Sequence, residues 1–366
     1  MENIIRQVES VKQASYQLIS METDQKNCVI QNLIQLIDEN REQILIENKK
    51  DIVKGEQEQL SKVLLKRLIL DNSKINGMLE GLNDVLNLPD PAGKVLAKVK
   101  MDEGLILEKI SVPLGVIGVI FESRPDALIQ ISSLCLKSGN AALLKGGKEA
   151  LFTNQYLFGL IEKAITKSDT AFNGCLQLLE SREDIKEMLK LNNYIDLIIP
   201  RGSNDLVRYI QKNTSIPVMG HADGICHVYI DERADIDMAV SVTLDAKCQY
   251  PAVCNALETL LVHENTAKQF LPKLVEAFNG QVEIRGDQAT QDIIPVIAAT
   301  DTDWKTEYTD LILSIRIVKS MDQAINHINT FSSHHTDSII TDDNKKAKEF
   351  LSRIDSSSVM HNCSTR

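Results

Sequence analysis

Cys254 is the residue of this sequence whose type and surroundings best suit covalent chemistry. It lies in the segment CQYPAVCNALE, residues 248–258. Pro251 precedes an apparent helix start at Cys254, and the N-terminal end of a helix favours the nucleophilic thiolate form of a cysteine. The alternative interpretation is a cysteine buried as a small apolar side chain, which the local sequence alone favours.

The remaining cysteines and the histidines form no recognisable metal or redox motif. The chain has seven cysteines, an odd number at irregular spacing, and no two are separated as CxxC. This spacing argues against a zinc site or a redox dithiol. The histidines are scattered, at His263, His327, His334 and His361 among others. We therefore expect free thiols in a reducing compartment and no bound metal.

Two glycine-containing turns have the residue types needed to approach a phosphate group. The run KGGKE at 145–149 follows an expected strand and opens an expected helix, and PRGS at 200–203 follows an expected strand at 195–199. Glycine lets the backbone come close to a ligand, and a helix N-terminus attracts anions. Because the GxGxxG fingerprint is absent, spacing alone leaves both turns equally open to being simple connections.

The elements that must position these residues fall into two blocks. Residues 1 to about 88 are expected to be helical, because apolar residues such as Ile30, Leu33 and Ile37 recur at helical spacing. A hairpin is expected next, with strands at 95–100 and 105–110. Expected strands then alternate with helices, at 116–120, 141–145, 176–179, 195–199 and 216–219, with one helix at 125–137. This alternation predicts a parallel sheet with helices on both faces.

The second block is a further α/β unit. Its expected helices lie at 235–247, from Cys254, and at 265–279, 321–331 and 343–353; its expected strands lie at 259–263, 315–318, 338–341 and 357–362. No linker rich in proline, glycine or serine separates the blocks, so we expect two closely packed domains with a cleft between them, divided at 232–233.

Composition excludes several classes of partner. The 366 residues are 43% hydrophobic and 25% charged, which is ordinary globular composition with room for about two domains. A net charge of −11 argues against nucleic acid and membrane surfaces as partners. No apolar run approaches the roughly 20 residues needed to cross a bilayer, and no secretion signal is visible. We expect a cytoplasmic protein.

Longer runs of residues resemble one family along nearly the whole chain. They are VPLGVIGVIFESRP at 112–125, KSGN at 137–140, LKGGKEA at 144–150, DLIIPRGS at 196–203, CHVYID at 226–231, VCNA at 253–256 with ETLL at 258–261, and HTD at 335–337. The series is similar to the glutamate-5-semialdehyde dehydrogenases, also called γ-glutamyl phosphate reductases, of the aldehyde dehydrogenase superfamily. It most resembles the reductase half of bifunctional pyrroline-5-carboxylate synthases, here without a kinase half.

The resemblance implies an aldehyde dehydrogenase-like α/β fold. Residues 1–232 would hold the N-terminal helices and a Rossmann-like NADPH-binding domain, with the hairpin at about 95–110 serving oligomerisation. Residues 233–362 would form the α/β catalytic domain. The family continues beyond residues 363–366 with a glycine-rich segment and a closing strand. We therefore expect this chain to lack that segment, and to regain full activity and a uniform dimer when the segment is added.

The same resemblance implies roles for single residues. Cys254 aligns with the nucleophile, Asn255 beside it belongs to the catalytic set, and Ser123 stands where many aldehyde dehydrogenases carry an oxyanion-hole asparagine. The residues implied in cofactor binding are Lys145, Gly146, Gly147, Lys148, Glu149, Gly202, Ser203 and Glu307. Lys145 and Glu149 are one residue further apart than their family counterparts. The candidate cations for an anionic substrate are Arg124, Arg201 and Lys247.

The implied reaction is the NADPH-dependent reduction of L-glutamyl 5-phosphate to glutamate 5-semialdehyde through a thioester on Cys254, the second step of proline biosynthesis from glutamate. The segment 219–224 lacks the glutamate that aldehyde-oxidising relatives use to activate water, which favours an acyl phosphate as substrate. Lys145 and Lys148 favour NADPH over NADH, whereas Glu149 has the opposite effect.

The expected partners are a glutamate 5-kinase that supplies the substrate and further copies of the chain in a homo-oligomer. Two alternatives stay open for the function itself. One is an aldehyde dehydrogenase working in the oxidative direction. The other is a catalytically impaired homologue with a structural or regulatory role.

Overall fold

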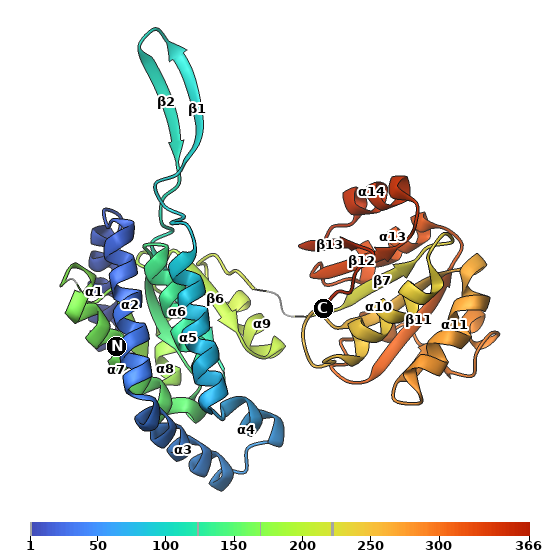
Figure 1. Ribbon diagram of the computed structural model, residues 1–366, viewed down its shortest axis with the longest axis horizontal. Helices are drawn as coiled ribbons and strands as arrows, with labels where there is room; N and C mark the ends of the chain where they lie inside the picture. The colour runs from blue at the N-terminus through green and yellow to red at the C-terminus, as the bar shows by residue number, and fades with distance from the viewer. Residues whose placement is uncertain (1, 123, 169, 221–222) are drawn as a thin grey trace. The chain divides into compact units, whose positions relative to one another are not determined.

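The structure is a computed structural model that describes residues 2–122, 124–168, 170–220 and 223–366 (Figure 1). By its internal contacts the chain divides into Met1–Gly220 and His221–Arg366, called here unit 1 and unit 2. The sequence placed the boundary at 232–233, after strand β7 (Cys226–Ile230). The structure assigns β7 to unit 2, because β7 pairs with strands β8 (Leu257–His263) and β12 (Thr336–Ile340) of that unit.

Unit 1 opens with helices, as the apolar spacing predicted. They are α1 (Glu2–Leu18), α2 (Thr23–Glu39), α3 (Arg41–Gln57), α4 (Lys62–Leu68) and α5 (Asn72–Asn87). The apolar residues Ile30, Leu33 and Ile37 of α2 are completely buried and join the core of the unit. Each removes most of an apolar side chain from water, which stabilises the fold by about 2 kcal/mol per residue.

The sheet of unit 1 is parallel throughout, in the order β5-β4-β3-β6. Its strands are β3 (Val116–Phe121), β4 (Ala141–Lys145), β5 (Leu176–Leu179) and β6 (Leu197–Arg201). The intervening helices are α6 (Pro125–Lys137), η1 (Lys148–Ala150), α7 (Leu151–Ser168), η2 (Thr170–Phe172), α8 (Arg182–Met188) and α9 (Asn204–Asn213). The strand predicted at 216–219 is wrong, because only one bridge forms there, between Ile198 and Val218. Pro217 at its centre has no N–H to donate to a ladder.

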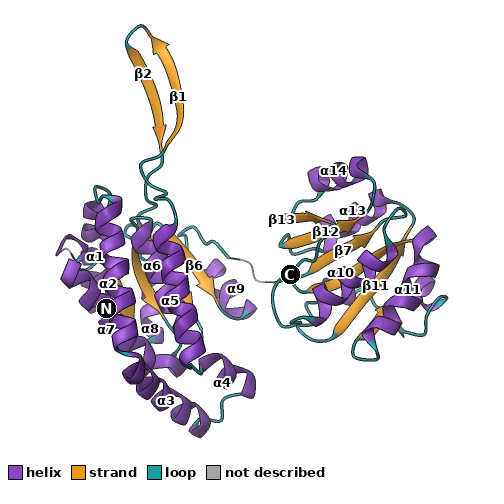
Figure 2. Ribbon diagram, viewed as in Figure 1, coloured by secondary structure: helices purple, strands orange, loops and turns teal. Residues whose placement is uncertain are grey.

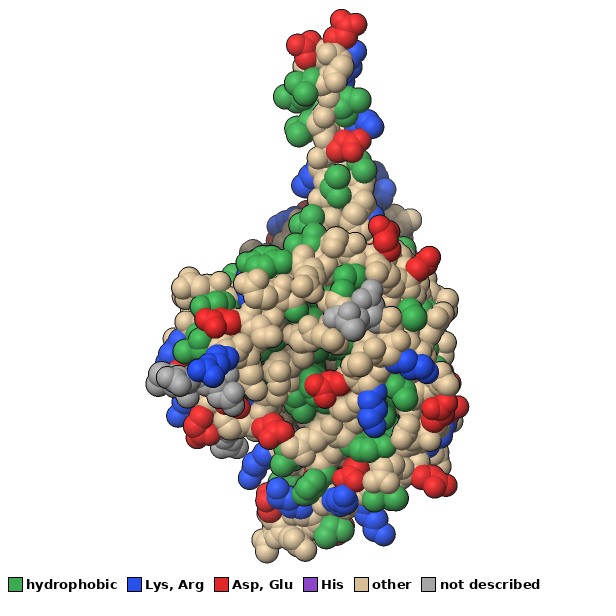
Figure 3. Space-filling view, turned by 90° about the vertical axis from the view of Figure 1, so that its left-hand side faces the viewer, with side chains coloured by type: hydrophobic (Ala, Val, Ile, Leu, Met, Phe, Trp, Pro, Cys, Tyr) green, Lys and Arg blue, Asp and Glu red, His purple; other side chains and the backbone are tan. Residues whose placement is uncertain are grey.

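The predicted hairpin is confirmed as strands β1 (Val95–Asp102) and β2 (Leu105–Ile110), paired antiparallel as a sheet of their own. Gly104 has a φ of +74°, the left-handed conformation that suits its turn. Every residue of both strands is exposed, and the ribbon projects from its unit (Figures 1 and 3). At its base Gly93 N–H donates to the Ser111 carbonyl.

Unit 2 is built on a seven-stranded sheet in the order β10-β9-β11-β8-β7-β12-β13, again parallel (Figure 2). Its further strands are β9 (Glu283–Gly286), β10 (Ile297–Ala298), β11 (Ile312–Val318) and β13 (Ser358–His361). Its helices are α10 (Ile236–Cys248), α11 (Glu264–Phe278), α12 (Gln288–Gln291), η3 (Asp303–Lys305), α13 (Met321–Phe331) and α14 (Asn344–Arg353). The sequence predicted neither β9, β10 nor α12.

Alternating residues of the central strands divide the core of unit 2 into two layers. Val228 of β7 and Leu260 of β8 join a cluster with α10 and α11, whereas Tyr229 joins a cluster with α13 and α14. Side chains of a strand point to opposite faces in turn, so each face of the sheet carries one pair of helices. Among the described helices, none is long and apolar enough to cross a membrane.

Candidate active site

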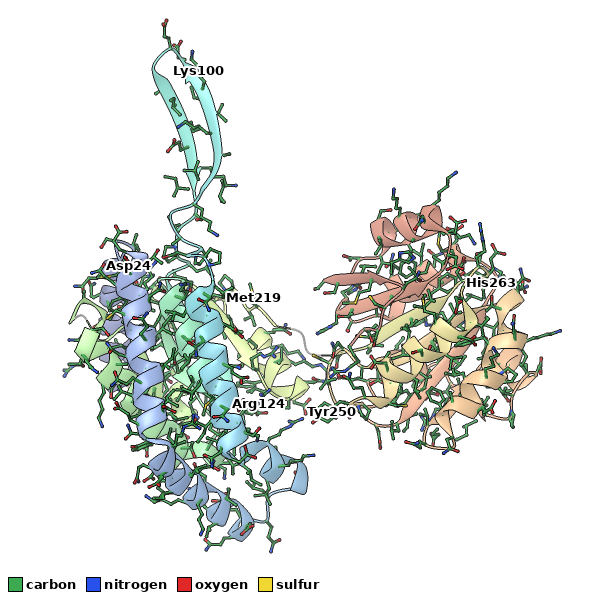
Figure 4. The ribbon with its side chains drawn as sticks, in the orientation of Figure 1. Asp24, Lys100, Arg124, Met219, Tyr250 and His263 are labelled. Atoms are coloured by element: carbon green, nitrogen blue, oxygen red, sulfur yellow. The ribbon has the colours of Figure 1, made fainter. Side chains whose placement is uncertain are left out.

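Cys254 lies in a turn of unit 2, not at the start of a helix. Helix α10 ends at Cys248, residues 251–256 form turns and bends, and β8 begins at Leu257. The helix predicted from Cys254 is therefore wrong, and no helix dipole of its own acts on the thiol. Figure 4 marks this loop by Tyr250, and the Cys254 side chain is half-buried. Because the turn is held by other segments of the unit, those segments fix where the sulfur lies.

Gly224, just before β7, and Cys226, its first residue, hold the backbone of Cys254. A Cβ atom added at Gly224 would lie 2.2 Å from the Cys254 carbonyl oxygen and 2.5 Å from its Cα, so only glycine fits there. The Cys226 thiol donates to the same carbonyl oxygen, with Sγ and oxygen 3.3 Å apart. Burial, with a contribution from Asp337, raises the pKa of Cys226 and keeps it a thiol. Sequence reasoning missed Gly224, whose neighbour comes from a distant segment.

Asn255, which was predicted to belong to the catalytic set with Cys254, accepts a hydrogen bond from an arginine that was not predicted from the sequence. The guanidinium of Arg366 donates to the Asn255 side-chain oxygen, and its Nε lies 3.1 Å from the Gln249 side-chain oxygen. Gln249 and Asn255 flank the Cys254 turn, so Arg366 spans it. No local pattern in the sequence marks this contact, because it requires residues 111 positions apart to meet.

Lys247 forms a buried ion pair. Its Nζ lies 2.7 Å from the Glu258 carboxylate, and both side chains are 0% exposed. Burial raises the pKa of Glu258 to about 7, against the opposing effect of Lys247, and burial also lowers the pKa of Lys247. Glu258 further accepts the Thr309 N–H at 3.3 Å. The pair thus joins α10 and β8 to the loop of Glu307, and its burial argues against the predicted contact of Lys247 with substrate.

A second buried polar cluster lies behind Cys226. Asp337 accepts from the His227 backbone N–H at 2.8 Å and lies 3.1 Å from the His227 ring nitrogen Nδ1. The ring of His327 stands 5.5 Å from that of His227 and 5.5 Å from that of Trp304. Burial, with smaller effects of His227 and Arg316, lowers the pKa of His327 to about 2. This cluster fixes β7 and β12, and His327 stays neutral.

The KGGKE turn of unit 1 connects β4 to η1 and α7, as predicted. A Cβ at Gly146 would lie 2.3 Å from the Asn154 side-chain nitrogen, and one at Gly147 would lie 1.9 Å from the Glu149 carboxylate. A larger residue at either position would therefore have to displace the Asn154 or the Glu149 side chain. Lys148 is exposed, with 63% of its side chain accessible, whereas Lys145 is buried and its amine donates to the Gly146 carbonyl.

The first N–H groups of α7 are already bonded by a carboxylate. Asp51 of α3 accepts from Phe152 N–H at 3.0 Å and from Thr153 N–H at 2.8 Å. Burial raises the pKa of Asp51, and these hydrogen bonds oppose that effect. A phosphate at this turn would consequently meet the exposed Lys148 side chain and not the open end of α7.

The second turn has a carboxylate of its own. Ser203 caps α9 by accepting the Leu206 N–H at 3.4 Å, and its own N–H donates to Glu122 at 3.1 Å. A Cβ at Gly202 would lie 2.7 Å from the same Glu122 oxygen. The sequence did not single out Glu122, because its contact spans 81 residues.

The sheet of unit 1 brings the predicted cofactor residues to one edge. Ile120 pairs with Lys145, and Phe121 pairs with Arg201, so the residues after β3, β4 and β6 share the carboxyl edge. Arg124 follows β3 there, exposed and 2.7 Å from Asp126 (labelled in Figure 4). Arg201 is exposed as well, and Ser123 lies outside the described residues. Parallel sheets bind ligands at this edge.

The residues with predicted roles therefore divide between the units. Unit 1 holds the two glycine turns with Arg124 and Arg201, and unit 2 holds Cys254, Asn255, Lys247 and Glu307. Among the described residues, no group of three histidine, cysteine, aspartate or glutamate side chains is placed to hold a metal ion. Unit 2 has a thiol for nucleophilic attack, and unit 1 has glycine turns and cations suited to a dinucleotide.

The sequence of this chain is similar to one protein family and to curated members of it. A model of the "Aldehyde dehydrogenase family" matches residues 2–312. A gamma-glutamyl phosphate reductase of Acetivibrio thermocellus is 52% identical over 357 residues, covering 97% of this chain and 83% of the relative. One from Methanosarcina barkeri is 48% identical over 376 residues, covering 100% of this chain and 84% of the relative.

The structure of this chain is also similar to solved structures of such proteins. A gamma-glutamyl phosphate reductase from Thermotoga maritima superposes with a TM-score of 0.96 at 38% identity, covering 99% of this chain and 88% of the other. An acetylating aldehyde dehydrogenase from Geobacillus thermoglucosidasius has a TM-score of 0.68 at 18% identity, covering 100% of this chain and 86% of the other, which supports the fold alone.

Proposed function

Since the chain belongs to the γ-glutamyl phosphate reductases of the aldehyde dehydrogenase family, we propose that it reduces L-glutamyl 5-phosphate to glutamate 5-semialdehyde and phosphate, in proline biosynthesis. The chain is an oxidoreductase of this family, and its cofactor is a nicotinamide dinucleotide. The observation that carries the proposal is Cys254, whose half-buried side chain lies in a turn with its backbone held by Gly224 and Cys226.

In the proposed reaction the Cys254 thiolate attacks the acyl carbon of the substrate. The new C–S bond forms as the C–O bond to phosphate breaks, and phosphate leaves with the electron pair and takes up a proton. NADPH, when bound, supplies the hydride that reduces the resulting thioester. The Cys254 backbone N–H and the Asn255 side chain stabilise the negative oxygen. Breaking the C–S bond then releases the aldehyde and restores the thiolate.

The cofactor is proposed to bind through the carboxyl edge of the unit 1 sheet. Gly146, Gly147 and Gly202 lie in the turns after β4 and β6, where the lack of a side chain lets a dinucleotide approach the backbone closely. Lys148 is exposed and able to pair with a 2′-phosphate, which supports NADPH over NADH. Glu307 would contact the nicotinamide ribose, on the loop that Glu258 anchors through Thr309.

The proposed assembly is a homo-oligomer joined through the β1–β2 hairpin, with a glutamate 5-kinase as the source of substrate. Apolar side chains line the exposed ribbon, with Leu105 and Leu107 each more than half exposed. We place the reaction in the cytoplasm, because all seven cysteines are free thiols, as expected in a reducing compartment.

Phosphate-dependent reduction of NADP⁺ by the semialdehyde tests the proposal. The wild-type chain should require phosphate, since the reverse reaction releases the thioester to phosphate; an aldehyde dehydrogenase working oxidatively would not require it. Cys254→Ser should lower turnover by at least about 1,000-fold while NADPH still binds, because the nucleophile is lost.

Cys28→Ser is the matched control, since Cys28 is an exposed thiol on α2 of unit 1, and it should retain wild-type turnover. Full activity of Cys254→Ser, or activity of the wild type without phosphate, would contradict the proposal. A chain with neither activity would support the structural or regulatory alternative.

A further inference from the structure

We propose that Arg366 binds an anionic group of the substrate next to Cys254. The inference rests on the proposed function, because an acyl phosphate of an amino acid offers two such groups, the phosphate and the α-carboxylate. Lys247, the one predicted cation in unit 2, is not suited to this task, because it is buried in an ion pair with Glu258.

The contacts of Arg366 place it on the nucleophile's turn. Its guanidinium donates to Asn255, the residue after Cys254, and to Gln249 at the end of α10, with Nε and oxygen 3.1 Å apart. The segment before it is tied to β12, because Ser338 Oγ donates to the Cys363 carbonyl at 2.8 Å. The position of Arg366 is therefore fixed in two ways: the segment before it is bonded to β12, and its guanidinium is bonded to the turn.

The charge of Arg366 is not neutralised by these contacts. Both acceptors are neutral amide oxygens, and within the described parts of the chain no carboxylate lies within 4.0 Å of its guanidinium; Lys247 and Arg285, by contrast, are each paired with carboxylates. A guanidinium has five N–H donors, of which these bonds use two. The remaining donors form the planar fork that suits a carboxylate or a phosphate.

The neighbouring residue has a hydroxyl group that is available for a further hydrogen bond. Thr365 is 0% exposed, and its hydroxyl has no hydrogen-bond partner among the described residues. Buried hydroxyls are nearly always bonded, so an unbonded one marks a position completed by a ligand or by water. Arg366, which bonds to the residues flanking the Cys254 turn, and Thr365 before it thus both have unused hydrogen-bonding capacity.

The reverse reaction separates the two anions, because phosphate and semialdehyde are added as different substrates. Arg366→Gln should raise the KM of one of them by about tenfold or more, as expected for a lost charge-assisted hydrogen bond, and leave the KM of NADP⁺ unchanged. A higher KM for phosphate identifies the phosphate as the bound group. A higher KM for semialdehyde, with no change for an aldehyde that lacks a carboxylate, identifies the α-carboxylate.

Protection of Cys254 from iodoacetamide tests the same inference without turnover. Inorganic phosphate or L-glutamate should protect the wild type, and Arg366→Gln should need about tenfold more of the bound anion for half protection. Arg366→Lys should restore part of the protection. Arg353→Gln, which removes an exposed arginine of α14, is the control and should behave as wild type.

Two outcomes overturn the inference. One is an Arg366→Gln variant with unchanged protection and unchanged KM values. The other is a variant whose unprotected alkylation rate and all KM values change together, because that pattern indicates a purely structural role for Arg366 in the turn. A wild type that is protected by anions but lacks phosphate-dependent turnover contradicts the proposed function and leaves this inference supported.

Discussion

Gly224 sets the position of Cys254, the proposed nucleophile, because its lack of a side chain leaves room for the Cys254 backbone. The Cys254 carbonyl carbon would lie 2.7 Å from a Cβ at this position, closer than real Cβ atoms approach backbone. The crowding atoms belong to backbone and not to a flexible side chain, so the turn itself would have to move. Misplacing a reacting group by about 1 Å is enough to cost roughly 100-fold in rate.

Gly224→Ala should therefore lower turnover by about 100-fold while the chain still folds and binds its nicotinamide cofactor. Gly286→Ala is the matched control, because a Cβ there meets the Thr290 and Val296 side chains away from Cys254. The control should lower stability but keep the alkylation rate of Cys254. Turnover and the alkylation rate of Cys254, measured on both variants, test whether Gly224 fixes the position of Cys254. A fully active Gly224→Ala chain would show that the turn tolerates the methyl group.

Residues of the candidate site could be predicted where a local or family pattern marks them, and not where they depend on contacts between distant segments. Cys254 was predicted from an extended family pattern and not from its local surroundings, where Pro251 wrongly indicated a helix. Lys148 and Gly202 were predicted as cofactor residues because glycine turns are local signals and match the family pattern. Glu122 and Arg366 were missed, since their contacts join residues 81 and 111 positions apart and depend on the folded arrangement.

At the scale of elements, predictions succeeded where the signal is local. The bounds of α6, β4 and β5 agree with the structure, because Pro125 and Gly139 flank the helix and short apolar runs mark the strands. Strand β10 was missed because it has two exposed residues and exists only through pairing with β9. The parallel α/β organisation was predictable from alternation, whereas the order of the strands depends on pairing between segments far apart in the sequence.

The packing of β7 and β11 against α13 gives unit 2 a pH-dependent stability through His327. Its folded pKa of about 2 lies below the unfolded value of about 6.5. The unfolded chain therefore binds a proton that the folded chain excludes once the pH falls below about 6.5. The groups facing the ring are Arg316, His227, Trp304 and Phe331, and no carboxylate among the described residues bonds to it.

The free energy of unfolding of unit 2 should fall by about 2 kcal/mol between pH 6.5 and pH 5 through this residue alone. His327→Gln keeps an acceptor for Arg316 but cannot take up the proton, so its stability should depend less on pH by that amount. Urea unfolding followed by circular dichroism at both pH values measures the difference. Parallel pH dependences of variant and wild type would show that His327 is not responsible.

At the scale of the whole molecule, the hairpin exposes a row of apolar side chains. Val99 and Leu107 are cross-strand partners at its centre, and both are exposed. A two-stranded ribbon is marginal in water by itself, and its unpaired edges favour association with another chain. Figure 3 shows apolar side chains along the ribbon and acidic side chains at its tip.

Leu107→Glu should weaken self-association by placing a charge at the centre of this surface. Light scattering should give a mass above 40.9 kDa for the wild type and a mass near 40.9 kDa for the variant. Ile46→Glu is the control, because it introduces the same charge at another exposed apolar position, on α3. This variant should have the same mass as the wild type. Equal masses for all three chains would exclude the hairpin as the contact.

The chain has a single tryptophan, so tryptophan fluorescence comes from unit 2 and not from unit 1. Trp304 is buried in unit 2, edge-on to His327 and 5.8 Å from the Arg316 guanidinium. Indole emission responds to exposure to water, so its change on unfolding reports the loss of unit 2 structure alone. Emission compared with total helix content therefore reveals, without any attached label, whether the two units unfold together or in sequence.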